Sequence, residues 1–334
     1  MVPFAAWLAV ACGGGDGGVG PTTAHPTEGH PTADGGRAIA DCRLFPANNV
    51  WNTRVNDLDP VADSDARLAW TEATLDGGLK AGACATVWEG SRCGIPWTLV
   101  DHTTPLQTVT FAGPWAWGQD DYPLPDDARI EGEPNPAGAW DRHVLLLDRD
   151  ACVVHELINV RQVFGAYYAD GAARWDLSAN DGAADVWAGA EAAGLAMLPG
   201  IFDHDEVARG HVSHALRLAL PLVQDQFVWP ATRTDGQARD ALAIPMGARL
   251  RLRDDARVDA LGPAARVLAT ALQEYGAIVA DTTVVTWSLT GVPDARWDEA
   301  DLGTLATLTP ADFDWVDTDP WQPEDGSMAT WPPP

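Results

Sequence analysis

Turn-forming residues are spread along almost the whole sequence and divide it into short segments. The 334 residues include 32 Gly and 25 Pro. Proline interrupts helices and is excluded from central strand positions, so long uninterrupted elements are not expected. Hydrophobic residues make up 46% of the chain, which is enough for a sizeable core. The sequence therefore predicts a mainly β or α+β fold, a β-sandwich or barrel-like single domain with a few accessory helices.

Short apolar runs bounded by turn residues predict the strands. These runs span residues 106–112, 143–148, 152–158, 214–220, 248–253, 277–281 and 284–289. The turn residues Arg149 and Asp150 lie between the second and third runs and predict a β-hairpin. The last two runs are expected to form a pair.

Two segments have helical patterns. Pro263 is at a helix-start position and Gly276 follows the predicted end. Five apolar residues between them share one helical face: Val267, Leu268, Ala271, Leu272 and Tyr275. A shorter helix is predicted over residues 205–209, closed by Gly210.

The N-terminus has the features of an export signal. Residues 1–12 contain a short apolar run that ends in small residues before Cys12, which predicts a lipoprotein signal with Cys12 as the lipidated residue. An ordinary cleaved secretory signal is the alternative. Residues 13–40 are rich in Gly, Pro and Thr and are expected to form a flexible linker. Residues 41–319 are the predicted globular domain, and residues 320–334 a disordered Pro-rich tail.

Charge limits the possible partners. The chain has 48 acidic and 21 basic residues and a formal net charge of −27. Nucleic-acid binding needs a basic surface, so no nucleic-acid partner is expected. Contact with a membrane is expected only through the N-terminal lipid. The predicted location is the bacterial envelope, at the outer membrane or the cell surface.

The cysteines fit an oxidising compartment. If Cys12 is lipidated, four cysteines remain, and they can form two disulfides in three possible pairings. The preferred pairing joins Cys84 to Cys93 across a short loop and Cys42 to Cys152. Zinc-type spacing of Cys and His is absent from the sequence, and neither a metal nor a cofactor is predicted.

The predicted hairpin offers one candidate for acid–base chemistry. If Asp148 pairs with Ala151, then His143 faces Glu156 on a side of the sheet that is otherwise apolar. A His and a Glu in such a place can act as general acid and base. A structural hydrogen-bonded pair at the rim of the core is the alternative.

A second candidate lies between residues 203 and 214. Asp203, Asp205 and Glu206 are followed by His211 and His214, and such groups can bind a metal or flank a sugar. The favoured interpretation is a helix N-terminus followed by a buried His214. Between the two candidates, the loops around residues 175–181 and 191–200 are possible ligand-entry sites.

Tryptophan is frequent, with 16 residues. Aromatic rings stack on the apolar faces of sugars, so a Trp-rich exported domain suggests contact with a glycan; filling of a loop-rich core is the alternative. Trp175, Trp187, Arg217 and Asp281 are the predicted substrate-binding residues.

Several short segments resemble a family of exported bacterial proteins without an established activity. They include residues 45–52, 141–143, 192–200, 205–207, 214–217, 245–247 and 291–297, and they extend over most of residues 42–317. Residues 187–194 (WAGAEAAG) stand where the family has WTSADAAG, so Glu191 replaces an Asp and Gly189 replaces a Ser. The resemblance implies a single domain and no particular reaction.

Two functions are expected from these patterns. The first is a surface lipoprotein that binds a polysaccharide or cell-envelope glycan through Trp-lined surfaces without catalysis. The alternative is a glycan-active enzyme, a glycoside hydrolase or polysaccharide lyase. Its candidate catalytic residues are His143, Glu156, Asp176, Glu191, Glu206 and His214. Motifs for serine hydrolases, zinc proteases, nucleotide binding and EF-hand calcium sites are absent from the sequence.

Overall fold

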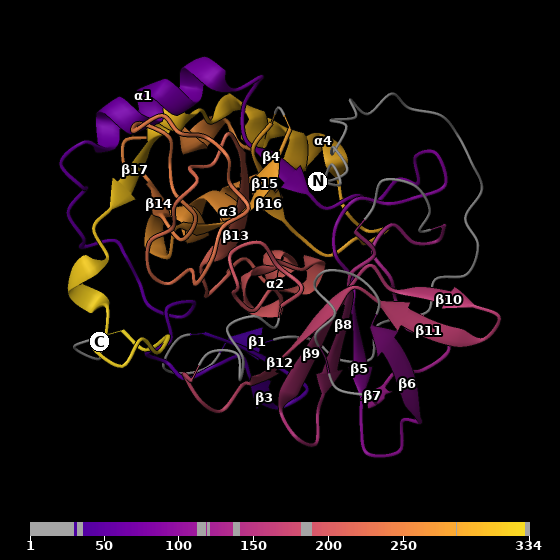
Figure 1. Cartoon of the computed structure of the whole chain (residues 1–334). Coiled ribbons are helices and arrows are strands. Elements are labelled where there is room, and N and C mark those ends of the chain that lie inside the picture. Colours follow the sequence, from indigo (N-terminus) through magenta and orange to yellow (C-terminus); the bar gives the residue numbers. More distant parts are fainter. Residues whose placement is uncertain are drawn as a thin grey trace.

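The chain folds into a mixed α+β structure in which strands dominate, as the sequence predicts (Figure 1). The computed structural model describes residues 36–111, 118, 121–135, 141–181, 189–284 and 286–330, together with the backbone of His30–Pro31. The strands form four open sheets. No helix in the described ranges is long and apolar enough to cross a membrane.

The largest sheet has six strands in the order β17-β14-β15-β13-β16-β4. Their bounds are β4 Lys80–Gly82, β13 Leu216–Pro221, β14 Arg249–Leu252, β15 Ala277–Thr283, β16 Ser288–Thr290 and β17 Phe313–Val316. The predicted pairing of the last two runs is wrong, because β13 lies between β15 and β16 and pairs with both. The parallel pair β13–β15 forms the centre of the sheet.

Two four-stranded sheets pack beside it, at the lower right of Figure 1. One has the order β12-β9-β8-β5, with β5 Trp97–Val100, β8 Val144–Asp148, β9 Val153–Ile158 and β12 Gly171–Asp176. The other has the order β10-β11-β6-β7, with β6 Leu106–Phe111, β7 Asp121–Pro123, β10 Arg161–Val163 and β11 Ala166–Ala169.

The sheet that contains β8 and β9 is buried on both faces. Leu145 and Leu147 belong to the main hydrophobic core, which they share with the six-stranded sheet. Leu146 and Leu157 belong to a smaller core between the two four-stranded sheets. The continuous apolar run of β8 follows from this position, because successive strand residues point to opposite faces.

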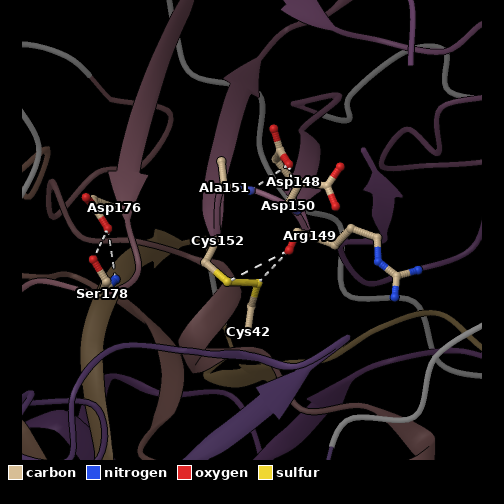
Figure 2. The surroundings of a disulfide bond; sticks show 8 residues. All are labelled: Cys42, Asp148, Arg149, Asp150, Ala151, Cys152, Asp176 and Ser178. Carbon is tan, nitrogen blue, oxygen red and sulfur yellow. Dashed lines mark hydrogen bonds between the residues drawn. A yellow bond between two sulfur atoms is a disulfide. The ribbon is translucent and has the colours of Figure 1, made fainter. Parts of the chain in front are cut away.

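The β8–β9 hairpin forms, but its predicted register is wrong. Leu145 pairs with Glu156 and Leu147 with Val154, so each residue of β8 lies opposite the residue two positions further along the chain than expected. The turn is longer than two residues because Asp148 Oδ1 accepts hydrogen bonds from the backbone N–H groups of Asp150 and Ala151 (Figure 2). His143 lies just before β8 and does not face Glu156.

The helices agree with the sequence where the pattern is strong. α3 (Pro263–Glu274) begins at the predicted proline and buries Leu268 and Leu272. α2 (His204–Ala208) is the predicted short helix, shifted by one residue. The other elements are α1 Ser64–Thr74, α4 Glu299–Leu302 and the 3₁₀ turns η1 Leu198–Gly200, η2 Val258–Ala260, η3 Gly303–Thr307, η4 Pro310–Asp312 and η5 Asp319–Trp321. α1 was not predicted, since Leu68 is the one large apolar residue that it buries.

Packed structure extends beyond both ends of the predicted domain. The three-stranded sheet β1 His30–Pro31, β2 Arg37–Ile39 and β3 Cys42–Arg43 begins before residue 41, and Arg37 and Ile39 are buried. Near the other end, Thr330 N–H donates to Asn48 O at 2.7 Å. The predicted signal peptide, Cys12 and most of the linker lie outside the described residues.

The predicted disulfide pairing is confirmed. Cys42 is bonded to Cys152 (Figure 2) and Cys84 to Cys93. The first joins β3 to the hairpin turn, 110 residues away in sequence, and the second closes a loop of 9 residues. Two disulfides indicate an oxidising, extracytoplasmic environment.

Candidate functional site

Arg217 of β13 is the centre of a group of charged side chains. Its Nε donates to Glu191 Oε1 at 2.5 Å, its Nη1 to Thr290 Oγ1 at 2.8 Å and its Nη2 to Asp281 Oδ2 at 2.8 Å. The side chains of Arg217 and Glu191 are buried, whereas that of Asp281 is 20% exposed. We call this group the Arg217 cluster; its further members are Glu131, Asp141, His143, Arg233 and Asp235.

The pairing of three strands explains why these partners meet. Arg217 is the second residue of β13, and its neighbour Leu218 pairs with Leu289 of β16, so Thr290 lies beside Arg217. A register shift in the parallel β13–β15 pair sets Ala219 opposite Asp281. Such an irregularity changes the direction of a side chain, here towards the guanidinium group.

Arg233 holds the segment that carries Glu191. Its Nε and Nη2 both donate to the backbone carbonyl of Glu191, and Glu191 Oε2 accepts from the N–H of Leu195. A Cβ at Gly189 would lie 1.8 Å from Arg233 Nη2, so a larger residue there would require the end of the Arg233 side chain to move.

His143 is held on both ring nitrogens. Nδ1 is 2.6 Å from Glu131 Oε2 and Nε2 is 2.8 Å from the carbonyl of Ala190. Oxygen atoms at both positions suit an imidazolium that donates from both ring nitrogens. Burial opposes this charge, but Glu131 and Asp141 outweigh it and raise the pKa of His143 to about 9. A histidine in this state is unsuited to act as a base at neutral pH.

Three carboxyl groups of the cluster have pKa values above the ordinary values of Asp and Glu. Burial raises the pKa of Asp141 to about 6, and nearby Glu131 and Asp281 add to the increase. Burial also raises the pKa of Asp235 to about 6, again with a contribution from Asp281. Burial raises the pKa of Glu191 to about 7 against the opposing charge of Arg217. Asp141 and Asp235 are only half-buried, so each residue is partly exposed to solvent although its pKa is raised.

The structure brings together four of the residues predicted from the sequence. His143, Glu191, Arg217 and Asp281 all belong to the Arg217 cluster. Glu131, Asp141, Arg233 and Asp235 were missed. Asp141 lies two residues before His143, in one of the segments on which the predicted resemblance depends, so the sequence contained a signal for it. The other three carry no such signal.

Glu156 has a structural role. It is fully buried, and its Oε1 accepts from the N–H groups of Met197 and Leu198 at 2.8 and 3.0 Å, while its Oε2 accepts from Trp175 Nε1 at 3.1 Å. Burial raises its pKa to about 7, although these hydrogen bonds oppose the increase. The predicted acid–base pair of His143 and Glu156 is not formed, since each has its own partners.

Asp176 and the two predicted Trp contacts do not join the cluster. Asp176 is exposed near the Cys42–Cys152 disulfide and accepts from the Ser178 N–H and Oγ (Figure 2). Trp175 is buried against Glu156. Trp187 lies outside the described residues.

Glu206 and His214 belong to a separate buried cluster. Asp203 and Glu206 form the capping box of α2, and Arg37 of β2 forms ion pairs with both. His214 Nε2 is 3.3 Å from Glu206 Oε2, and Nδ1 is 2.8 Å from Ala215 O. All four side chains are buried. The favoured interpretation, a helix start with a buried His214, is confirmed.

Tryptophan fills the core more than it lines a surface. Trp51, Trp175 and Trp287 are among the largest fully buried side chains. Among the Trp residues that the structure describes, Trp88 is the only one more than a third exposed, at 46%. Within the same described part, His, Cys, Asp and Glu do not form a group suited to hold a metal ion.

Comparisons with known proteins do not assign the chain to a family. No protein-family model, curated protein or solved structure matches this chain. The resemblance to exported bacterial proteins therefore stays a prediction, and the candidate function depends on the geometry of the site.

Proposed function

We propose that the protein is an extracytoplasmic hydrolase that cleaves a glycosidic bond by carboxylate acid–base chemistry at the Arg217 cluster. The observation that carries this proposal is the arrangement of three half-buried aspartates around one buried arginine. Asp281 is ion-paired to Arg217, whereas burial raises the pKa values of Asp141 and Asp235 to about 6. Carboxyl groups in different environments, one paired with a cation and one desolvated, suit the two roles that glycoside hydrolysis requires.

Each aspartate has a role in this mechanism. Asp235, in its protonated form, gives a proton to the glycosidic oxygen as the bond from that oxygen to the sugar carbon breaks. Asp281, as a carboxylate, takes a proton from the water that attacks the sugar carbon. Arg217 positions Asp281 through the bond from its Nη2. Asp141 is the second candidate for the acid, because its pKa lies in the same range.

β-Elimination suits this site less well than hydrolysis. A lyase must neutralise the carboxylate of its uronic-acid substrate with a cation that the substrate can reach. Arg217 donates from Nε and both terminal nitrogens, and His143 is bonded on both ring nitrogens. A purely binding role would need exposed Trp side chains, and among the described Trp residues Trp88 alone is more than a third exposed. Tryptophan therefore gives this role little support.

The test is hydrolysis of a polysaccharide panel by the full-length protein, followed as released reducing ends between pH 4.5 and 8. An acid with a pKa of about 6 is protonated below that pH, so activity is expected to fall roughly tenfold or more between pH 5 and pH 8. Asp235→Asn and Asp281→Asn are each expected to lower kcat by roughly 100-fold or more. The matched control is Asp254→Asn, because Asp254 is exposed and remote from the cluster.

Three results would count against hydrolysis. Retention of a polysaccharide without released products would favour the binding role. Unsaturated products, detected by the ultraviolet absorbance of a conjugated uronate, would indicate elimination. Equal activity of Asp235→Asn, Asp281→Asn and Asp254→Asn would move catalysis away from the Arg217 cluster.

A further inference from the structure

Thr282 of β15 contacts both carboxyl groups to which the proposed hydrolysis assigns a proton transfer. Its Oγ1 donates to Asp235 Oδ2 at 3.0 Å, and its backbone N–H donates to Asp281 Oδ1 at 2.9 Å. Asp235 lies 47 residues earlier in the chain, whereas Asp281 is the neighbour of Thr282 in β15. One residue therefore links the loop that carries Asp235 to the strand that carries Asp281.

The irregular pairing of β13 with β15 is located directly before Thr282. The register of this parallel pair shifts between Leu218 and Ala219, and Ala219 lies opposite Asp281. An extra residue in a strand bends it and changes the direction of the side chains beside it. Asp281 and Thr282 are consecutive residues after this shift, and both are half-buried. The shift thus places the two groups of Thr282 that donate at the edge of the Arg217 cluster.

The charged and polar groups around Asp235 act on it in both directions. Burial raises its pKa to about 6, and the negative charge of Asp281 adds to the increase. The hydrogen bond from the Thr282 hydroxyl is the largest effect that lowers this pKa, followed by the backbone N–H of Asp235 itself and by Arg217. Arg233, in the same loop, is a further cation near this carboxyl group. The Thr282 hydroxyl therefore stabilises the carboxylate that remains once Asp235 has given up its proton.

We infer that Thr282 is a positioning residue of the proposed site, because its hydroxyl and its backbone N–H together hold the Asp235 acid in place relative to the Asp281 base. This inference rests on the proposed function, since it adds a residue to the same site. Thr282 acts through the two aspartates and not by contact with the substrate. A catalytic group displaced by about 1 Å loses much of its effect, so such a link matters for the rate.

Three variants isolate the hydroxyl group. Thr282→Val removes it at nearly constant size and keeps the backbone N–H, so the contact with Asp281 is retained and the contact with Asp235 is lost. Thr282→Ser keeps the hydroxyl and is the conservative variant. The matched control is Thr270→Val, because Thr270 is exposed on α3 and its hydroxyl donates to the carbonyl of Arg266.

The first measurement is an NMR titration of the full-length protein, isotopically labelled at the aspartate carboxyl carbons. The Asp235 signal is identified by its absence from Asp235→Asn. In Thr282→Val the pKa of Asp235 is expected to rise by roughly one unit above the wild-type value, because the carboxylate loses a hydrogen bond. In Thr282→Ser and Thr270→Val it should equal the wild-type value.

The second measurement is the pH dependence of hydrolysis of a polysaccharide that the wild-type protein cleaves. In Thr282→Val, kcat at pH 5 should fall roughly tenfold with KM unchanged, since Asp235 is protonated there but no longer held in place. The fall in activity towards high pH should move upwards by as much as the Asp235 titration does. Thr282→Ser should restore both. A loss of folded protein would lower the whole profile without moving it along the pH axis.

The outcomes separate this inference from the proposed function. Equal Asp235 titrations in the wild-type protein and Thr282→Val would overturn the inference, even if a glycan is cleaved, and so would an unchanged kcat. A raised pKa of Asp235 in Thr282→Val that returns to the wild-type value in Thr282→Ser would support it. If the titration behaves in this way and no glycan is hydrolysed, the proposed hydrolysis fails alone. Thr282→Ala removes the same hydroxyl and gives the same comparison if Thr282→Val does not fold.

Discussion

Arg217 of β13 and Arg249 of β14 show how the same residue type can have different roles within one sheet. Arg217 binds two carboxylates, one of which is partly exposed. Arg249 is just as deeply buried but donates to the carbonyls of Val50, Thr53 and Tyr275. Arg249 thus ties irregular backbone to the sheet, whereas Arg217 organises groups that can exchange protons with a ligand.

The first residue-scale prediction concerns Glu156. Glu156→Ala removes the acceptor of two buried backbone N–H groups and of the Trp175 indole, and it leaves a cavity in the core. Each unsatisfied donor costs about 1–3 kcal/mol, so a loss of about 4 kcal/mol in the free energy of unfolding is expected. Urea unfolding measures it.

Asp176→Ala is the control for this variant, because Asp176 is exposed and bonds only within its own turn. Both substitutions should retain the active-site chemistry in whatever fraction remains folded. Equal stability of the two variants would show that Glu156 does not support the loop that contains Met197 and Leu198.

The second residue-scale prediction concerns His155 in the smaller core. Burial and the nearby Arg174 lower its pKa to about 4, against about 6.5 in the unfolded chain. The unfolded chain therefore binds the proton first. The stability contributed by neutral His155 is fully present above pH 6.5 and is lost as the pH falls through about 4, by up to roughly 3 kcal/mol.

The effect is measured as the difference between the wild-type protein and His155→Leu in unfolding free energy from pH 7 to pH 4. The carboxyl groups with raised pKa values change stability in the opposite direction, but they contribute equally to both proteins and cancel. The wild-type protein should lose more stability on acidification than the variant does. Parallel curves would mean that His155 is protonated in the native core.

At the scale of elements, the two disulfides differ in what they join. Cys42–Cys152 connects β3 to the β8–β9 turn across 110 residues, whereas Cys84–Cys93 closes a loop of 9 residues. Chain-entropy arguments give roughly 5 kcal/mol for the long loop and roughly 2.5 kcal/mol for the short one. Cys42→Ser/Cys152→Ser should therefore lower the denaturation midpoint more than Cys84→Ser/Cys93→Ser, as measured by urea titration. The reverse order would show that local strain outweighs loop length.

β2 is the second element whose contribution can be tested. Its Arg37 neutralises Asp203 and Glu206 at the start of α2, and all three side chains are buried. Arg37→Met keeps much of the apolar stem of the side chain but removes the guanidinium group from two buried carboxylates, which is expected to cost about 3–5 kcal/mol. The control is Arg239→Met, because the Arg239 side chain is 90% exposed and its ion pair with Asp225 is long. Thermal unfolding of both variants distinguishes a structural ion cluster from a dispensable one.

At the scale of the whole molecule, the net charge of −27 is a source of instability. Repulsion among carboxylates disfavours the compact state, and salt screens it over about 10 Å at 0.1 M. Raising the sodium chloride concentration from about 0.01 to about 0.5 M is therefore expected to raise Tm at pH 7. The increase should shrink at pH 4.5, where carboxyl groups begin to be protonated. A Tm that is independent of salt at pH 7 would show that opposite charges are already well paired at the surface.

The arrangement of sheets decides where the candidate site lies. The β8–β9 sheet packs against the six-stranded sheet through the main core, and the Arg217 cluster lies between these two sheets. His143 directly precedes β8, whereas Arg217 and Asp281 belong to the six-stranded sheet. Charged groups at such a junction are desolvated by both sheets, which is why several carboxyl pKa values are raised there.

The sequence by itself determined the local features of this protein. The apolar runs marked β6, β8, β9 and β13–β15, the Pro263 start marked α3, and loop lengths favoured the correct disulfide pairing. These features depend on neighbouring residues or on simple spacing. Only the tertiary structure decided the hairpin register, which differs from the expected one by two residues, and the composition of the Arg217 cluster. That cluster joins Glu131, Glu191, Asp235 and Asp281 from separate segments. The pKa values of Glu191 and Asp235 depend on burial, which no short stretch of sequence encodes.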